Sequence, residues 1–232
     1  MSPQTSEPTD KAVAPVVMLP GTLCDARLFA PVLDLLGMRA HIPQLGGATS
    51  MRAMAAHLLD DLPGRFALCG FSLGAAVALE MAAQAADRVD RLALIGCNPG
   101  LLPPEALEFR RALSQREFVA ANYEHTDPSI RALIEDMADA TAADVYHEQT
   151  QATLNRADSR LRLADLSMPV LLLCGAEDRL CPPELSIEMA KSIQHARLAV
   201  IDGAGHYVTL ERPSAVAAEI SAWLATPYPT FH

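Results

Sequence analysis

The sequence predicts an α/β fold in which a mostly parallel sheet carries helices on both faces. Short apolar runs of strand length alternate with longer segments of helical period along most of the chain. These runs are apolar at every position rather than at alternate positions, as in strands buried on both faces. The chain has 232 residues, half of them hydrophobic, which is enough for one sizeable core. We therefore expect a single domain with a helix-covered sheet.

Five runs are strand candidates, and four helical patterns are interleaved with them. The strand candidates are VAPVVML (13–19), RFALC (65–69), RLALIG (91–96), PVLLLC (169–174) and RLAVI (197–201). The helical patterns cover the region around Ala26 to Leu36 and the segments 73–86, 183–194 and 214–224. A strand followed by a helix and then another strand is typical of parallel pairing.

One long stretch breaks this alternation. Between Pro99 and Ser167 the sequence has helical patterns at Glu105–Asn122, Pro128–Ala138 and Ala142–Asn155, and no credible strand. A single crossover needs only a dozen or so residues, so we favour a small helical cap over the carboxyl ends of the strands. An ordinary crossover with an added excursion is the alternative. The expected organisation is a disordered polar tail at 1–12 and one domain at 13–232, with a cap insertion at about 99–167.

Composition excludes several classes of partner. The net charge is −10 and the sequence pI is near 5.1, which disfavours a surface that tracks nucleic-acid phosphates. The first residues lack a basic segment followed by an apolar one, and no apolar run approaches the roughly 18 residues needed to span a bilayer. We expect a soluble cytoplasmic protein that acts on a small molecule without nucleic acid or membrane. Nothing in the sequence indicates an oligomeric state.

The five cysteines favour buried thiols in a reducing compartment. Cys69, Cys97 and Cys174 fall in or just after apolar runs, and five cysteines cannot all pair within one chain. The sequence contains no CxxC and no His/Cys cluster with zinc spacing, so we expect neither a metal nor a cofactor. A redox-sensitive pair of Cys174 and Cys181 is the alternative interpretation.

A glycine-flanked serine is the first candidate for chemistry. Gly70-Phe71-Ser72-Leu73-Gly74 has the G-x-S-x-G pattern of a nucleophile elbow, in which a strand reverses sharply into a helix. Glycines relieve the crowding that such a turn creates. The helix then begins beneath the serine, so its amides suit an oxyanion, and we expect the backbone N–H of Leu73 to be one donor. A tight turn with a serine in it is the structural alternative.

A serine nucleophile needs a base and an orienting carboxylate, in the chain order Ser, Asp, His for this elbow. Of the seven histidines we select His206, because a short apolar run and two glycines precede it. Two carboxylates, Glu177 and Asp178, follow the strand candidate 169–174. Asp202 is a weaker candidate for the acid because it lies at the end of its own strand.

Two further parts of a site can be assigned. The loop after the first strand is expected to supply the second oxyanion donor, and there we assign the backbone N–H of Thr22, with Leu23 as the alternative. A plain Pro-Gly turn would leave the same pattern. Aromatic residues of the predicted cap either line a pocket or belong to the core, namely Phe109, Phe118, Tyr123 and Tyr146.

From about Val16 to Trp223 the chain resembles the α/β-hydrolase superfamily, in particular its small carboxylesterases, enol-lactonases and C–C hydrolases. The resemblance lies in the first loop, the elbow, the G-x-x-D-x-x-x-P run from Gly175 to Pro182, and Gly205-His206 followed by Glu-Arg-Pro. It implies that Asp178 rather than Glu177 is the acid. Two departures are Pro20-Gly21 where many relatives have His-Gly, and a degenerate segment at 42–47 that predicts a reduced strand or pocket rim.

These residues together predict a serine hydrolase that cleaves a small carboxylic ester, thioester or lactone through an acyl-enzyme on Ser72. A C–C bond hydrolase and a cofactor-free perhydrolase or oxygenase would keep the same triad. A non-catalytic ligand-binding member of the fold is a distant alternative, since such a protein needs none of the three residues for chemistry.

Overall fold

The structure is a computed structural model that describes residues 14–122 and 127–227. The predicted tail at 1–12 and the candidate pocket residue Tyr123 lie outside these ranges.

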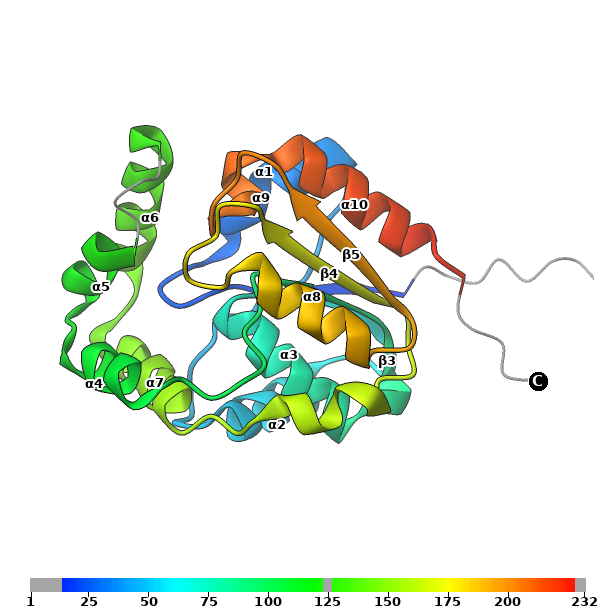
Figure 1. The fold of residues 1–232 in the computed structure, drawn as a ribbon, viewed down its shortest axis with the longest axis horizontal. Helices are drawn as coiled ribbons and strands as arrows, with labels where there is room; N and C mark the ends of the chain where they lie inside the picture. The colour runs from blue at the N-terminus through cyan, green and yellow to red at the C-terminus, as the bar shows by residue number, and fades with distance from the viewer. Residues whose placement is uncertain (1–13, 123–126, 228–232) are drawn as a thin grey trace, which may run out of the picture.

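A five-stranded parallel sheet forms the centre of the molecule (Figure 1). Its strands lie in the order β1-β2-β3-β4-β5, so spatial neighbours follow one another in sequence. All four neighbouring pairs are parallel, which confirms the predicted fold class. The bounds are β1 Val16–Leu19, β2 Phe66–Phe71, β3 Val89–Ile95, β4 Val170–Gly175 and β5 Ala196–Ile201.

Beside β1, at the edge of the sheet, the described residues form one isolated bridge and no sixth strand. A single parallel bridge joins Val17 to His41. The N–H of His41 donates to the carbonyl of Val16 at 2.8 Å, and the N–H of Met18 donates to the carbonyl of His41 at 2.9 Å. This agrees with the reduced strand that the degenerate segment predicts.

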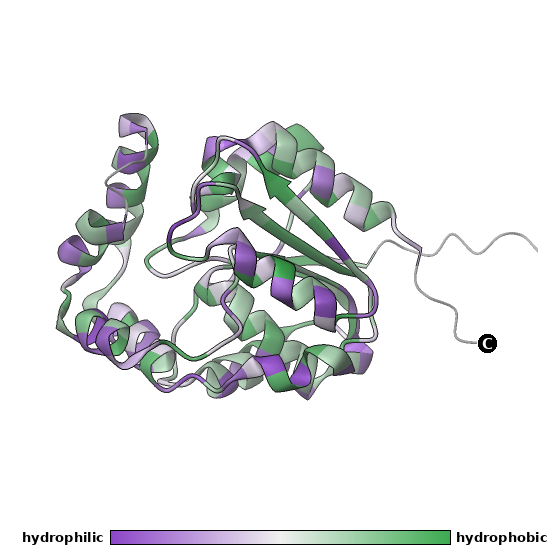
Figure 2. Ribbon diagram, viewed as in Figure 1, coloured by the Kyte–Doolittle hydropathy of each residue, from purple (hydrophilic) through white to green (hydrophobic). Residues whose placement is uncertain are grey.

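Helices cover both faces, and each face has its own apolar cluster. On one face lie α2 Met51–Asp61, α3 Leu73–Gln84 and α8 Pro183–Ser192; on the other lie α1 Ala30–Leu36, α9 Val208–Glu211 and α10 Pro213–Ala225. Neighbouring residues of a strand belong to different clusters, Val17 to the first and Met18 to the second. This explains why β1, β2 and β4 are apolar at every position, and why much of the sheet is green in Figure 2.

Helix α2 was not predicted from the sequence. Its apolar face is built from methionine, alanine and one leucine, which give a weaker period than larger residues do. The signal that could have found it is Ser50, whose hydroxyl accepts a hydrogen bond from the N–H of Ala53 at 3.2 Å, as an N-cap does.

Four α-helices lie between β3 and β4 in the described part of the chain, and Figure 1 places them beyond the carboxyl ends of the strands. We call them the helical segment: α4 Pro104–Ala112, α5 Gln115–Asn122, α6 Pro128–Ala140 and α7 Ala143–Leu154. A short helix at Ser159–Asp165 follows and contacts α3 and α8 instead. No helix among the described residues is long and apolar enough to cross a membrane.

The prediction of one helix from Glu105 to Asn122 was wrong, because a new helix begins after Ser114. Its N–H donates to Glu117 Oε2 at 2.9 Å, and the N–H of Glu117 lies 3.4 Å from the Ser114 hydroxyl. This reciprocal pair is a capping box, which starts a helix and so separates α4 from α5.

Candidate active site

Ser72 is the single residue between β2 and α3, and its backbone has a positive φ of +54°. A side chain rarely adopts this conformation, so the surrounding structure must hold it. The N–H of Ser72 donates to the carbonyl of Ile95 on β3 at 2.9 Å. A Cβ atom at Gly74 would overlap the carbonyl oxygen of Leu19, and one at Gly70 would overlap that of Gly74. The glycines of the motif therefore permit close approach of three backbone segments.

The structure brings Ser72, His206 and Asp178 into one hydrogen-bonded chain. The Ser72 Oγ lies 3.1 Å from Nε2 of His206, and Nδ1 of the same ring lies 2.7 Å from Oδ2 of Asp178. A carboxylate accepts hydrogen bonds, so Nδ1–H donates to Asp178 and Nε2 is left to accept from the serine hydroxyl. His206 and Asp178 are 8% and 3% exposed, so the hydrogen bond between them is shielded from water.

Asp178 is fixed at the end of β4 by the loop that follows it. Its Oδ1 accepts the N–H groups of Leu180 at 2.9 Å and Cys181 at 2.8 Å, so both carboxylate oxygens are engaged. The two alternative acids, Glu177 and Asp202, have exposed side chains. Of the three carboxylates considered from sequence, Asp178 is the one that contacts His206.

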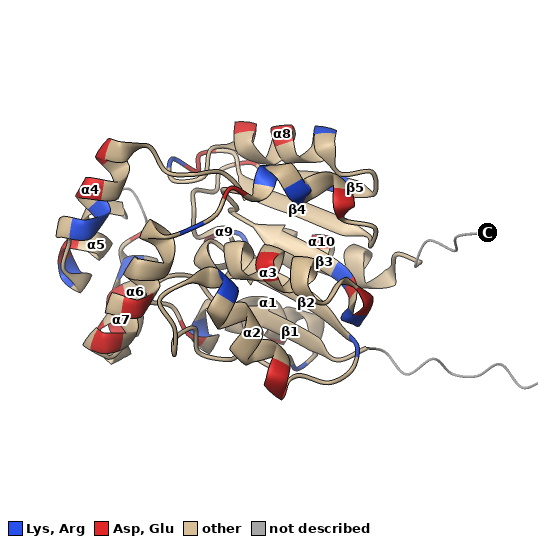
Figure 3. Ribbon diagram, turned by 90° about the horizontal axis from the view of Figure 1, so that it is seen from below, with Lys and Arg blue, Asp and Glu red and all other residues tan. Residues whose placement is uncertain are grey.

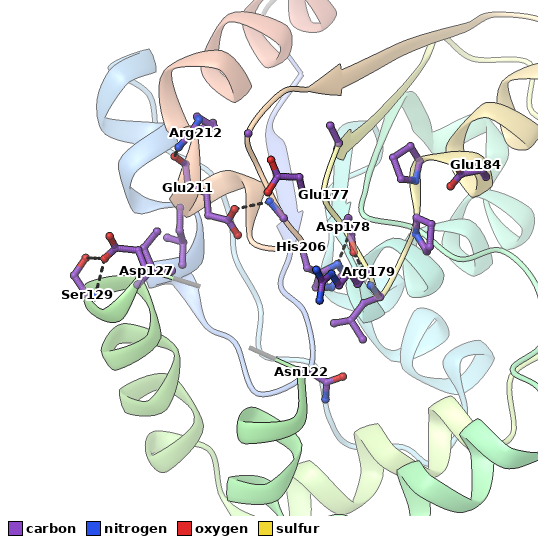
Figure 4. Close-up of a pocket in the computed structure, with 18 residues that line it drawn as sticks. Asn122, Asp127, Ser129, Glu177, Asp178, Arg179, Glu184, His206, Glu211 and Arg212 are labelled. Atoms are coloured by element: carbon purple, nitrogen blue, oxygen red, sulfur yellow. Dashed lines mark hydrogen bonds and ion pairs between the residues drawn. The ribbon is translucent and has the colours of Figure 1, made fainter. Parts of the chain in front are cut away.

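Glu211 forms hydrogen bonds with the loop that carries His206 (Figure 4). Its carboxylate accepts the N–H of Gly205 and, at 3.1 Å, the N–H of Tyr207, the residues on either side of the histidine. The ring of Phe71 packs against the imidazole with 4.9 Å between centroids. Backbone and ring contacts thus restrict where the imidazole can lie.

The loop after β1 lies beside the serine, and Thr22 and Leu73 both line the cavity that contains Ser72. Leu23 also has a left-handed backbone, with φ of +59°, and its N–H donates to Oε1 of Gln149 at 3.0 Å. The N–H that we considered as an alternative oxyanion donor is therefore already engaged inside the protein. This leaves Thr22 as the candidate from this loop.

A cavity of about 270 Å³ opens onto Ser72 and His206. Two aromatic residues predicted for a pocket, Phe109 and Phe118, line it. Tyr146 does not, because it is buried among helices and its hydroxyl bonds to Arg110 at 2.8 Å and to the carbonyl of Leu113 at 2.9 Å. The lining also includes Met51, Phe71, Leu102, Leu180, Asn98, Arg110, Arg156 and Arg179.

A wider cleft of about 970 Å³ also reaches His206 (Figure 4). It is polar and is lined by Asp178, Glu177, Glu211 and Arg212.

Sequence reasoning missed the arginines of the cavity and the amide of Gln149. Arg110 is 6% exposed, and its guanidinium lies 4.0 Å above the Phe118 ring. Arg156 follows α7 and donates to the carbonyl of Asn98 after β3. None of these residues belongs to a motif, and their contacts join separate helices, so no local sequence signal identifies them.

All five cysteines are buried free thiols. Burial raises the pKa of Cys174 and of Cys181, which opposes the thiolate that a redox pair needs. Possible ligand atoms of Cys181, Asp178 and His206 lie within 4.8 Å of one another. Asp178 and His206 are already bound to each other in the serine chain, so this cluster offers no independent metal site.

Known proteins share both the sequence pattern and the fold. A curated pimeloyl-[acyl-carrier protein] methyl ester esterase of Nitrosomonas europaea is 29% identical over 228 residues, covering 85% of this chain and 90% of that protein. A thermophilic esterase of Thermogutta terrifontis, solved with malate bound, superposes with a TM-score of 0.77 and 27% identity, covering 91% of this chain and 89% of the other. An enol-lactonase of Burkholderia xenovorans, 23% identical, has the same fold with a TM-score of 0.80 over 92% of each chain.

The profile of the Alpha/beta hydrolase family matches residues 16–219, which is most of the chain and includes Ser72, Asp178 and His206. Together with the sheet and the similar structures, this match shows that the chain belongs to the alpha/beta hydrolase family.

Proposed function

We propose that this protein is a serine esterase that hydrolyses a small-molecule carboxylic ester through an acyl-enzyme on Ser72. The observation that carries the proposal is the hydrogen-bonded chain from Ser72 through His206 to Asp178, which opens into a cavity. The similar curated and solved proteins that are named esterases support the same chemistry. The C–C hydrolase and perhydrolase alternatives have no comparable support.

Each residue has a defined role in the proposed reaction. The Ser72 oxygen attacks the ester carbonyl carbon while Nε2 of His206 takes the hydroxyl proton. The same nitrogen then protonates the alcohol oxygen as the carbon–oxygen bond breaks, leaving an acyl group on Ser72. Water then attacks the acyl carbonyl carbon and gives a proton to His206. His206 passes this proton to the Ser72 oxygen as the bond between that oxygen and the acyl carbon breaks, which releases the carboxylic acid and restores the serine hydroxyl. Asp178 stabilises the transient imidazolium and holds the tautomer that leaves Nε2 free to accept.

The negative charge that develops on the carbonyl oxygen needs donors held in advance. The backbone N–H groups of Thr22 and Leu73 are our candidates, since both residues line the cavity beside Ser72. Leu73 is the first residue of α3, where backbone N–H groups lack helical partners and the helix dipole is positive. Loss of one such donor costs about 3 kcal/mol of transition-state stabilisation in comparable sites.

We further propose that the helical segment acts as a cap, as the sequence led us to expect. Phe109 of α4 and Phe118 of α5 line the cavity opposite the sheet-borne residues. A cover of this kind excludes water and shapes the space for acyl and alcohol groups.

The test is covalent labelling with a fluorophosphonate probe together with turnover of p-nitrophenyl and alkyl esters of increasing chain length. We expect the wild type to be labelled and to release acid and alcohol in equal amounts. Ser72→Ala should lose both labelling and turnover while keeping its thermal unfolding temperature. A wild type that neither reacts with the probe nor cleaves any ester would refute the proposal.

A further inference from the structure

The cavity at Ser72 has a charge opposite to that of the chain as a whole. Three arginines line it, Arg110, Arg156 and Arg179, and no aspartate or glutamate is among its described lining residues. The protein has a net charge of −10, and α6 and α7 carry acidic residues, drawn red in Figure 3. Because a low-dielectric cleft focuses the field of the charges that line it, this cavity attracts anions despite the acidic surface.

Arg156 is partly buried and has few hydrogen-bond partners inside the protein. One of its terminal nitrogens donates to the carbonyl of Asn98, and its Nε is buried without a hydrogen-bond partner among the described residues. The acidic side chain that acts on it is Asp158, which is already paired with Arg160 at 2.5 Å. Burial lowers the pKa of Arg156, although a guanidinium remains protonated in proteins at neutral pH.

A positive charge held in this way is incompletely compensated. Burying an ionised group is costly unless it is paired and hydrogen-bonded. The neutral carbonyl of Asn98 satisfies part of the hydrogen-bonding capacity of Arg156 but supplies no negative charge. The five donors of a guanidinium match the two oxygens of a carboxylate, so an anionic ligand in the cavity would provide both charge and acceptors.

The neighbouring lining groups fit an anion at the same place. Asn98 lines the cavity with Arg156, and Arg179 reaches it from the loop that follows Asp178. Arg110 is held against Phe118 and Tyr146, with its carbon Cζ 4.0 Å and 4.9 Å from the two ring centroids. The apolar residues Leu102 and Phe109 line the same space, which suits a short hydrocarbon chain.

We propose that the substrate is an anionic ester, the monoester of a short dicarboxylic acid, and that Arg156 binds its free carboxylate. This inference rests on the proposed function, because it assigns the ester group to Ser72 and the carboxylate to the arginine in the same cavity. Water and the monoester then give an alcohol, the dicarboxylate and one proton. Arg156 acts here as a specificity-determining residue. The small volume of about 270 Å³ limits the chain between the two groups to a few carbons.

The first measurement compares matched substrates with the wild-type protein. Monoethyl succinate, monoethyl glutarate and monoethyl adipate are each paired with the ethyl ester of the fatty acid of similar length, in which a methyl group replaces the carboxylate. We expect kcat/KM, followed by acid release, to be at least tenfold higher for the anionic member of the best pair. Raising the salt concentration should reduce this preference. Free glutarate should inhibit hydrolysis of the neutral ester competitively.

Variants then assign the preference to one side chain. Arg156→Met should lower the ratio of anionic to neutral kcat/KM by roughly 10- to 100-fold, the loss expected when hydrogen bonds to a charged group are removed. Arg156→Lys should retain part of the ratio that Arg156→Met loses. Lysine keeps the positive charge but lacks the planar guanidinium that binds both carboxylate oxygens. Arg116→Met is the matched control, because Arg116 is exposed, pairs with Asp139 and does not line the cavity. It should leave the ratio unchanged.

The outcomes separate the two proposals. If the wild type cleaves neutral esters at least as well as anionic ones, and dicarboxylates do not inhibit it, the anionic substrate is refuted while the esterase stands. If no ester is cleaved and Ser72 is not labelled, the proposed function itself fails. If Arg156→Met does not fold, as judged by thermal unfolding, the wild-type substrate comparison and the inhibition by glutarate still decide the matter.

Discussion

The side-chain amide of Gln149 accepts the N–H of Leu23 at 3.0 Å and so joins α7 of the helical segment to the loop after β1. Its Nε2 donates to the carbonyl of Leu45 at 2.8 Å, and the side chain is 1% exposed. Leu23 has φ of +59°, a conformation that costs a residue with a side chain about 1–2 kcal/mol. The hydrogen bond helps hold this strained residue next to Thr22, the proposed oxyanion donor.

We predict that Gln149→Met lowers both stability and kcat. The substitution keeps the approximate volume but leaves a buried N–H and a buried carbonyl without their partner, at about 1–3 kcal/mol each. Relaxation of Leu23 would displace the N–H of Thr22, so kcat should fall more than KM changes. Urea unfolding and ester kinetics measure the two effects, with Gln151→Met on the same helix as the control. If kcat is preserved while stability falls, Gln149 has no role in positioning the loop.

Asp178→Asn tests the proposed acid against its neighbour. Removing the negative charge destabilises the imidazolium, and the amide disturbs the tautomer of His206, so we expect kcat to fall by roughly 10³- to 10⁴-fold. Glu177→Gln changes the adjacent, exposed carboxylate in the same way and should alter kcat by less than about twofold. Near-normal turnover by Asp178→Asn, measured at saturating ester, would show that another group orients His206.

The elbow glycines predict a steric effect that depends on position. Gly74→Ala places a Cβ on the carbonyl oxygen of Leu19, which is backbone and cannot move aside easily. Overpacking of this kind costs about 1–3 kcal/mol. Gly64→Ala is the matched control, since nothing lies within 4 Å of its added Cβ and its φ is not positive. Chemical unfolding of the two variants should differ by more than 1 kcal/mol, and equal stability would contradict the described packing.

The buried thiols predict a loss of stability at alkaline pH. Burial raises the pKa of Cys24, Cys69 and Cys97 from the ordinary value of 9.0 to about 12. Above pH 9 the unfolded chain releases these protons and the folded protein does not, so the unfolded state is favoured progressively up to about pH 12. Each thiol contributes roughly 1 kcal/mol per pH unit in this window.

Urea unfolding at pH 8, 9, 10 and 10.5 measures this slope. Cys69→Ala removes one of these thiol titrations, so its stability should fall less steeply with pH than that of the wild type, whatever the effect of the substitution at pH 8. Parallel slopes for the two proteins would show that Cys69 does not remain protonated in the folded state.

The sequence by itself determined the architecture and the candidate triad, because both follow from local patterns. Continuous apolar runs identify strands that are buried on both faces, and β2 and β4 lie within about two residues of their predicted ranges. The turn at Ser72 requires glycines at fixed spacing. Because the strands are parallel, the strand ends that carry Ser72, Asp178 and His206 all lie at the carboxyl end of the sheet. Their expected proximity therefore needed no knowledge of packing.

Tertiary structure alone decided which other side chains surround the carboxyl ends of the strands. Gln149 binds Leu23 from 126 positions away, and Arg156 meets Asn98 from 58 positions away. No periodicity links such residues, since their contact depends on how the helical segment packs on the sheet. That packing engages the N–H of Leu23 and leaves Thr22 as the candidate donor. It also places the guanidinium of Arg156 in the cavity of Ser72, the feature from which we infer an anionic substrate.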